Sequence, residues 1–197
     1  MAIKPILFNT EMVRAILDGR KDATRRIVKG FIPDDAVWGY TAFTPKGYIS
    51  CRGTFADGYG EKFFKLPCEP GDILYVRETW KKAPNGYYYY EDWQRNDIAD
   101  VTKWKPSIHM PKEAARIWLK VTDVRVERLQ EITSEQICRE GVEVEYPHVL
   151  NGEEKRYAFS RLWNSTIKKS DLDCYGWNAS PWVWVIEFER CEKPEGV

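Results

Sequence analysis

The residue types most able to do chemistry are gathered in a short segment near the amino terminus. Its basic and hydroxyl side chains are Arg20, Lys21, Thr24, Arg25 and Arg26. A single lysine just after a helix is explained by the helix dipole, which favours a cation there. Three arginines beside it repel one another unless an anion or a carboxylate lies between them. The segment therefore predicts a basic pocket for an anionic or polar ligand.

A single glutamate, Glu140, is the second candidate, because it is expected in the last turn of a helix. The helix dipole disfavours an anion there, and a group placed against local stability is a functional candidate. A neutral Lys21, its pKa depressed by the neighbouring arginines, can attack a carbonyl or activate water. Glu140 can then carry a proton to the leaving group while Thr24 holds a substrate oxygen. The alternatives are a structural Lys21–Glu140 ion pair and an exposed glutamate.

Charge is spread unevenly along a chain whose formal net charge is zero. Residues 1–30 are rich in Lys and Arg, and residues 129–155 are rich in Glu. The two segments either face each other across a site or form two separate solvated faces. Proteins that hold long duplexes through counterion release are usually basic overall. Any contact with nucleic acid should therefore be local.

Two further segments hold candidates for ligand binding. Arg77 and Trp80 follow a buried strand and are expected near the mouth of the pocket, or else in a surface ion pair and a packing contact. His109 is a hydrogen-bonding candidate or a structural histidine. Nine tryptophans are present, and rings such as Trp80 or Trp177 can stack on bases, although aromatic rings also dominate protein cores.

Capping signals predict the elements that position these residues. Asn9 is expected to cap a helix that ends at Gly19, followed by a strand over residues 24–28. Thr133 and Gln136 predict a capping box for a helix that ends beside Glu140. Other expected elements are strands over residues 5–8, 73–76, 115–129 and 181–188, with a bulge or a turn near residues 122–123, and a helix over residues 154–167.

The order of these elements predicts an α+β fold, a small mixed β-barrel with flanking helices, rather than a parallel doubly wound sheet. The 197 residues suit a single domain with two loop or hairpin insertions, at about residues 30–70 and 81–104. The strand over residues 182–186 is apolar on both faces, which predicts a central position.

The five cysteines match no zinc or redox spacing, so we predict reduced structural thiols, no metal and no cofactor. No signal peptide or membrane span is visible, which favours a cytoplasmic protein that does not bind membranes. The sequence leaves the oligomeric state open.

The segment from Ile16 to Arg26 resembles the signature of ASCH domains, in which a helix ends in Gly-Arg-Lys and is followed by two variable residues, Thr and a strand with Arg. Gly71-Asp72 and Glu140-Gly141 resemble two shorter elements of that family. Residues 75–80 and 105–111 resemble segments of uncharacterised ASCH-like proteins from phages and prophages. The resemblance spans most of the chain except the two insertions.

This resemblance implies a PUA-like β-barrel, a fold associated with the recognition of RNA and modified bases. Small bacterial relatives are acetylcytidine amidohydrolases, which implies catalytic roles for Lys21, Thr24 and Glu140. The expected partners are RNA, single-stranded nucleic acid or a modified nucleoside. Two alternatives stay open: a non-catalytic RNA or nucleotide-binding module, and a phage-derived interaction protein whose Tyr-rich insertion is the contact surface.

Overall fold

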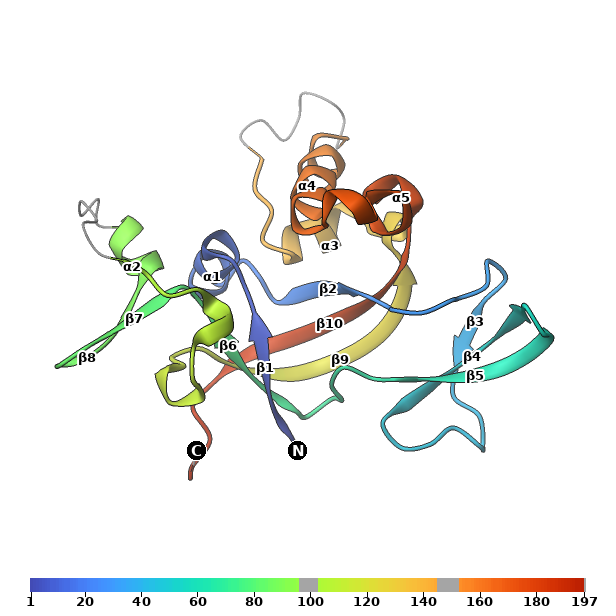
Figure 1. The fold of residues 1–197 in the computed structure, drawn as a ribbon, viewed down its shortest axis with the longest axis horizontal. Helices are drawn as coiled ribbons and strands as arrows, with labels where there is room; N and C mark the ends of the chain where they lie inside the picture. The colour runs from blue at the N-terminus through green and yellow to red at the C-terminus, as the bar shows by residue number, and fades with distance from the viewer. Residues whose placement is uncertain (96–102, 145–152, 197) are drawn as a thin grey trace.

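The computed structural model describes residues 1–95, 103–144 and 153–196, and a five-stranded mixed sheet forms its centre (Figure 1). Its strands lie in the spatial order β1 (Ile3–Leu7), β6 (Ile73–Arg77), β9 (Trp118–Arg128), β10 (Trp182–Cys191) and β2 (Ala23–Ile27). Strand β1 is parallel to β6, and the other neighbours are antiparallel. Strand β10 lies inside the sheet between β9 and β2, which confirms the central position predicted from its apolar residues.

The bulge predicted near residues 122–123 is present where β9 pairs with β10. Glu187 lies opposite Asp123, whereas the next residue, Phe188, lies opposite Val121. Thr122 is therefore the extra residue of β9, and the side-chain alternation shifts by one position there.

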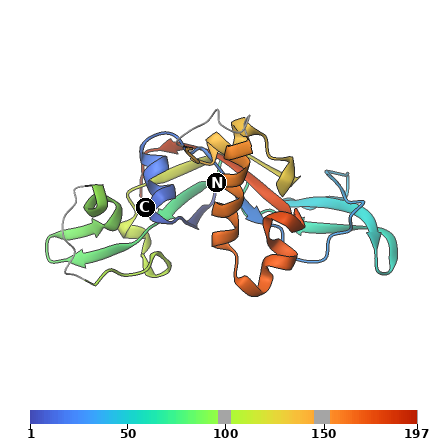
Figure 2. The ribbon, with the colours of Figure 1, turned by 90° about the horizontal axis from the view of Figure 1, so that it is seen from above.

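The helices that matter for the site lie together on one side of this sheet, above β2 and β10 (Figures 1 and 2). They are α1 (Thr10–Leu17), α3 (Ser134–Arg139) and α4 (Glu153–Thr166). The predicted caps are confirmed: the side chain of Asn9 accepts a hydrogen bond from the Met12 amide at 2.8 Å, and Thr133 and Gln136 form a capping box. The shorter helical elements are α2 (Tyr90–Arg95), α5 (Leu172–Tyr175) and the 3₁₀ turns η1 (Ser107–His109), η2 (Lys112–Ala114), η3 (Leu129–Glu131), η4 (Lys169–Asp171) and η5 (Trp177–Ala179).

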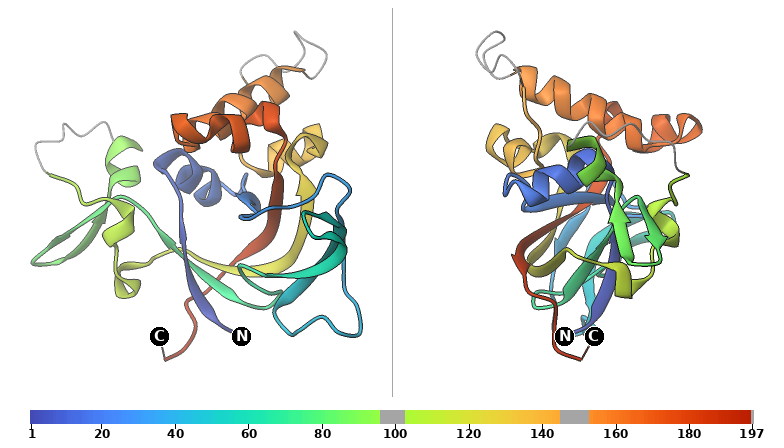
Figure 3. Two further views of the ribbon diagram at one scale, coloured as in Figure 1. Left: turned by 45° about the vertical axis from the view of Figure 1, so that its right-hand side comes forward. Right: turned by 90° about the vertical axis from the view of Figure 1, so that its left-hand side faces the viewer.

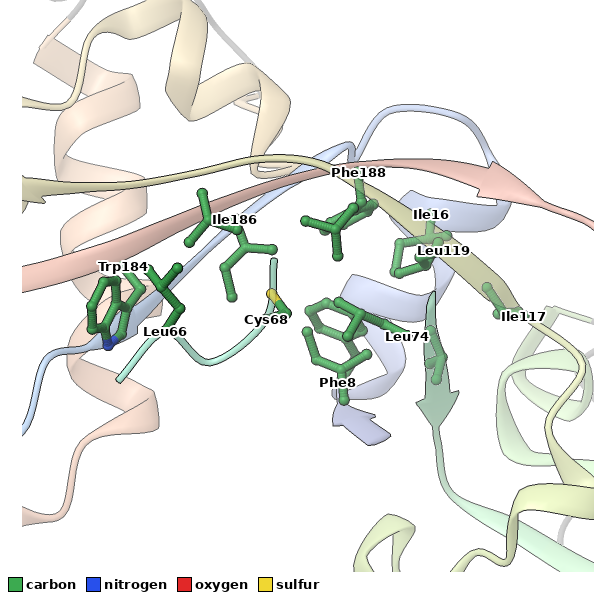
Figure 4. Packing of buried hydrophobic residues seen from close by; sticks show 14 of the residues in the cluster. Phe8, Ile16, Leu66, Cys68, Leu74, Ile117, Leu119, Trp184, Ile186 and Phe188 are labelled. Carbon is green, nitrogen blue, oxygen red and sulfur yellow. The ribbon is translucent and has the colours of Figure 1, made fainter. Parts of the chain in front are cut away.

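Two further sheets extend to opposite ends of the molecule (Figure 2). One contains β3 (Val37–Gly39), β4 (Tyr48–Phe55) and β5 (Gly58–Lys65); the other is the hairpin of β7 (Trp80–Ala83) and β8 (Gly86–Tyr89). The three-stranded sheet shares the main core, because Ile49 and Leu66 pack in the same cluster as Leu74 and Trp184. Figure 4 shows Leu66 beside Trp184 in this cluster.

The chain therefore has the predicted α+β fold, in which the five-stranded and the three-stranded sheet share one core (Figure 3). A second apolar cluster fixes α4 to the sheet, because Phe159 and Trp163 pack against Val183 and Val185 of β10. None of the helices in the described ranges is long and apolar enough to cross a membrane.

Candidate functional site

The turn after α1 brings the basic segment against the end of α3. The backbone amides of Arg20 and Lys21 both donate to the carbonyl of Ala15, at 2.8 and 3.0 Å. Lys21 then forms an isolated antiparallel β-bridge with Glu140. The basic and acidic segments of the sequence therefore meet at the core of the site.

The side chain of Lys21 is buried and forms a complete set of hydrogen bonds. It has no exposed surface, and its Nζ lies 2.7 Å from Glu140 Oε2. Nζ also donates to the carbonyl of Glu140 at 2.9 Å and to that of Ala23 at 2.8 Å. Three acceptors therefore surround Nζ, as many as the protons of an ammonium group.

Burial is the main influence on the proton affinity of Lys21. Because burial disfavours the charged form, it lowers the pKa of Lys21 below its ordinary value. The charge and the hydrogen bond of Glu140 raise this pKa, and the charges of Arg26 and Arg25 lower it further. Release of a proton from Lys21 is therefore easier than from an exposed lysine.

Arg25 is also buried, and its partners are carboxylates of the chain itself. Its Nη1 lies 3.1 Å from Glu140 Oε1, and its Nη2 lies 3.2 Å from Glu127 Oε2. Nη2 also donates to Gln136 Oε1 at 3.1 Å. Of the two alternatives, a bound anion or a carboxylate of the chain, Arg25 has the second, supplied by Glu140 and Glu127. Arg25 belongs to an internal ion network and is not an open phosphate clamp.

The hydroxyl of Thr24 is buried beside this network. Its Oγ1 accepts a hydrogen bond from Arg26 Nη1 at 3.0 Å. Arg26 is held in turn by the carbonyls of Arg25 at 3.1 Å and Leu7 at 2.9 Å. No residue in the described ranges accepts the Thr24 hydroxyl proton, so this proton is available to a ligand.

A small inner cavity lies where Thr24 and Glu140 meet α4. Its volume is about 30 Å³, enough for a water molecule or two. A ring the size of benzene needs a cavity of about 150 Å³, so a base does not fit here. The lining residues are Met12, Thr24, Arg25, Arg26, Glu140, Phe159, Leu162, Trp163 and Thr166.

Two larger cavities share lining residues with the inner one. The outer cavity, of about 320 Å³, is lined by Leu7, Asn9, Met12, Arg25, Arg26, Ile27, Trp163, Thr166 and Ile167. The far cavity, of about 340 Å³, is lined by Glu11, Met12, Arg14, Ala15, Arg20, Glu140, Gly141, Val142, Glu143, Ala158 and Leu162. Residues of α4 line all three cavities, and the inner one shares lining residues with each of the other two; we call the three together the groove and α4 its roof.

Arg20 lies at the rim of the far cavity, with its guanidinium held by the chain. Its Nη1 donates to the carbonyl of Gly141 at 3.1 Å. Its Nη2 lies 3.1 Å from Asp18 Oδ2, and its Nε lies 3.2 Å from Glu143 Oε1. Arg20 is therefore part of the wall of the groove.

Three other predicted binding residues lie in a different part of the molecule. Arg77 Nε donates to the carbonyl of Met110 at 2.7 Å and anchors the segment that contains His109. Trp80 is buried and packs with Met110 and Trp118, while His109 is exposed. Arg77, Trp80 and His109 line none of the three cavities, so the structure does not bring them to the cluster. Trp177 packs edge-on against Phe159, outside these cavities.

Sequence reasoning missed several residues that complete the site. Glu127 has no local signal, because it reaches Arg25 only through the pairing of β9, β10 and β2. Gln136 is recognisable as a capping residue, yet its Oε1 also accepts from Arg25. The apolar stripe of Phe159, Leu162 and Trp163 in the sequence is consistent with a helix that covers the cavities, although the same stripe is equally typical of a helix packed on a core.

Gly141 allows the close approach of α3 to α1, and its substitution should destabilise the protein. Its φ is +82°, and a Cβ there would lie 2.6 Å from Ala15 Cβ and 3.1 Å from Lys21 Cβ. We expect Gly141→Ala to lower the free energy of unfolding by about 2–4 kcal/mol, from backbone strain and overpacking together. Urea denaturation followed by circular dichroism measures this change.

Gly19→Ala is the matched control, because Gly19 has φ +73° and nothing within 4 Å of its added Cβ. It should cost only the backbone term, about 1–2 kcal/mol. Equal losses in the two variants would show that α1 and α3 are not in close contact.

No family model matches the sequence, and no curated protein matches it. Among solved structures, the chain is similar to a high-resolution crystal structure of an ASCH domain from Lactobacillus crispatus JV V101, with 11% sequence identity and a TM-score of 0.41. The similarity covers 96% of this chain and 79% of that one. That protein carries the name of the family whose motifs this sequence resembles.

Proposed function

We propose that the groove beneath α4 is the active site of an amidohydrolase that removes the acyl group from N-acylated cytidine, as a nucleoside or within RNA. The observation that carries the proposal is the convergence of Lys21, Thr24 and Glu140 from two segments far apart in the sequence. Thr24 and Glu140 line the inner cavity, and Lys21 holds the carboxylate of Glu140 at 2.7 Å. Burying so many charges together is costly, which favours a functional reason for the cluster.

The outer cavity suits the base. Its volume of about 320 Å³ lies in the range of small-molecule sites, roughly 300–1,000 Å³. Ile27 and Trp163 provide apolar surface for a ring, and Asn9 and Arg26 provide polar groups for its edge. A base placed here directs its exocyclic amide toward the inner cavity, which shares Arg26 and Trp163 with the outer one.

The chemistry follows from the groups at the inner cavity. Water adds to the carbonyl carbon of the amide while Glu140 takes one of its protons. The hydroxyl of Thr24 donates a hydrogen bond to the carbonyl oxygen as negative charge develops there. The C–N bond then breaks, and Glu140 returns the proton to the leaving nitrogen, which gives a carboxylic acid and cytidine. Lys21 is a positioning residue in this scheme and not the nucleophile, because all its protons are engaged.

The test is the release of cytidine from N4-acetylcytidine, followed by liquid chromatography. The wild-type protein should release cytidine and acetate in equal amounts. The double variant Lys21→Met/Glu140→Gln removes the proposed general base and replaces both charged side chains by uncharged ones. It should release neither product above the uncatalysed rate. Absence of release by the wild type, or equal release by the variant, would overturn the proposal.

A second function, binding without catalysis, is favoured by one set of contacts. Each oxygen of Glu140 is already hydrogen-bonded, Oε2 by Lys21 and Oε1 by Arg25. With both oxygens engaged by side chains of the protein, the cluster would then only shape a pocket. In that case N4-acetylcytidine should bind and stay intact, and the affinity for cytidine monophosphate should fall as salt rises.

A further inference from the structure

We propose that Glu127 is a positioning residue for the hydrolysis, because it holds Arg25 in a place where Glu140 keeps lone pairs free for the proton of water. The inference rests on the proposed function and adds to it a residue that lines none of the three cavities. Glu127 acts through Arg25, whose guanidinium lies between the two carboxylates.

The register of the central sheet brings Arg25 and Glu127 together. Arg25 of β2 lies opposite Val185 of β10, and Glu127 of β9 lies opposite Val183. Alternate residues of a strand share one face of a sheet, so all four side chains lie on the same face. The two valines are short and buried, and the guanidinium crosses β10 above them to reach Glu127 Oε2 at 3.2 Å. The sheet therefore fixes this contact.

The guanidinium of Arg25 is shared between partners on two sides. Its Nη1 lies 3.1 Å from Glu140 Oε1, while its Nη2 lies 3.2 Å from Glu127 Oε2 and 3.1 Å from Gln136 Oε1. Its Nε is buried and has no hydrogen-bond partner in the part of the chain that the structure describes. Arginine favours two parallel hydrogen bonds to one carboxylate, and an unpaired buried donor is costly. Glu127 therefore draws Arg25 away from a two-fold contact with Glu140.

This sharing leaves Glu140 able to accept a proton. An ionised carboxylate has about four lone-pair positions. Lys21 takes one on Oε2 and Arg25 takes one on Oε1. A second hydrogen bond from Arg25 would take a third position and hold the carboxylate more tightly. By engaging Nη2, Glu127 keeps the contact to a single bond and Glu140 available as the base.

Glu127 is itself fixed from the other side, so it cannot follow Arg25 toward Glu140. Its Oε1 lies 2.6 Å from Arg125 Nε. Arg125 also holds Asp123 at 2.8 Å through its Nη1. In the described ranges Asp123 has its ion pair with Arg125 alone, so it shares the outer partner of Glu127 without contacting Arg25.

The experiment measures kcat and KM for N4-acetylcytidine in variants of Glu127. Glu127→Ala should lower kcat by about 10–100-fold, the scale of a misplaced catalytic group, and leave KM nearly unchanged. Glu127→Gln keeps a side-chain oxygen that accepts from Arg25 and should recover most of the activity. In Arg25→Met no guanidinium is left to be held, so adding Glu127→Ala should cause no further loss of kcat. Thermal melts establish that each variant is folded.

Asp123→Ala is the matched control, because it removes a carboxylate from Arg125 on the same strand and should keep the wild-type kcat. If the wild type is active but Glu127→Ala keeps its kcat, or the two losses add in the double variant, the positioning role is overturned and the proposed activity stands. If the wild type hydrolyses no N4-acetylcytidine, the proposed activity falls and this inference with it.

A crystal structure of Glu127→Ala decides the matter if Arg25→Met does not fold. Two donors of Arg25 on the carboxylate of Glu140 would support the proposal. A guanidinium in its wild-type position would overturn it.

Discussion

Replacing Glu140 by alanine is expected to lower the free energy of unfolding by about 3–5 kcal/mol, because it leaves two buried cations without their shared partner. Lys21 and Arg25 have side chains that are 0% and 1% exposed, and Glu140 is hydrogen-bonded to both. Urea denaturation monitored by circular dichroism gives the change directly.

The double variant Lys21→Met/Glu140→Gln separates the loss of charge balance from the loss of packing. It removes both charges of the pair, and the side-chain amide oxygen introduced by Glu140→Gln can still accept from Arg25. We expect it to lie within about 2 kcal/mol of the wild type, because neutral replacements for a buried pair cost far less than one missing partner.

An exposed ion pair provides the control for this prediction. Lys120 and Glu189 lie 3.4 Å apart with side chains that are 51% and 58% exposed. Glu189→Ala should change the free energy of unfolding by less than about 1 kcal/mol. A loss of similar size in Glu140→Ala would mean that the cluster is open to water and would contradict its burial.

The local parts of the site could be predicted from the sequence because they depend on local physics. Asn9 and Thr133 cap their helices by accepting hydrogen bonds from backbone amides three residues further along the sequence. These caps fix where α1 and α3 begin. Glu140 is the C-cap of α3, and Lys21 follows Asp18, the C-cap of α1, by three residues. The need for an anion or a carboxylate among the clustered cations followed from electrostatics alone.

The parts of the site that could not be predicted from the sequence depend on contacts between segments far apart in the chain. Glu127 meets Arg25 only because β9, β10 and β2 are neighbours, and that order is a property of the whole sheet. The division of the groove depends on how Phe159 and Trp163 pack against β10. Arg77 was expected at the pocket mouth because it follows a buried strand, yet the carbonyl of Met110 holds it elsewhere.

Substitution of Thr24 distinguishes catalysis from binding without catalysis, because its hydroxyl is the proposed donor to the reacting carbonyl oxygen. We expect Thr24→Val to lower kcat/KM for N4-acetylcytidine by about 100–1,000-fold, the usual cost of removing one hydrogen bond to a developing oxyanion. Valine has nearly the same shape as threonine, and Arg26 still donates hydrogen bonds to the carbonyls of Arg25 and Leu7. The stability loss should therefore be only about 1 kcal/mol. Steady-state kinetics and a thermal melt measure the two effects.

The loss should appear in kcat and leave KM nearly unchanged, because the hydroxyl acts on charge that exists only in the transition state. Thr24→Ser restores the hydroxyl and should recover most of the activity, which a purely structural role for the methyl group would not produce. Thr54→Val, in β4, removes a hydroxyl that donates to Asp35 at 2.7 Å and should leave the kinetics unchanged. A Thr24→Val variant as active as the wild type would remove Thr24 from the chemistry.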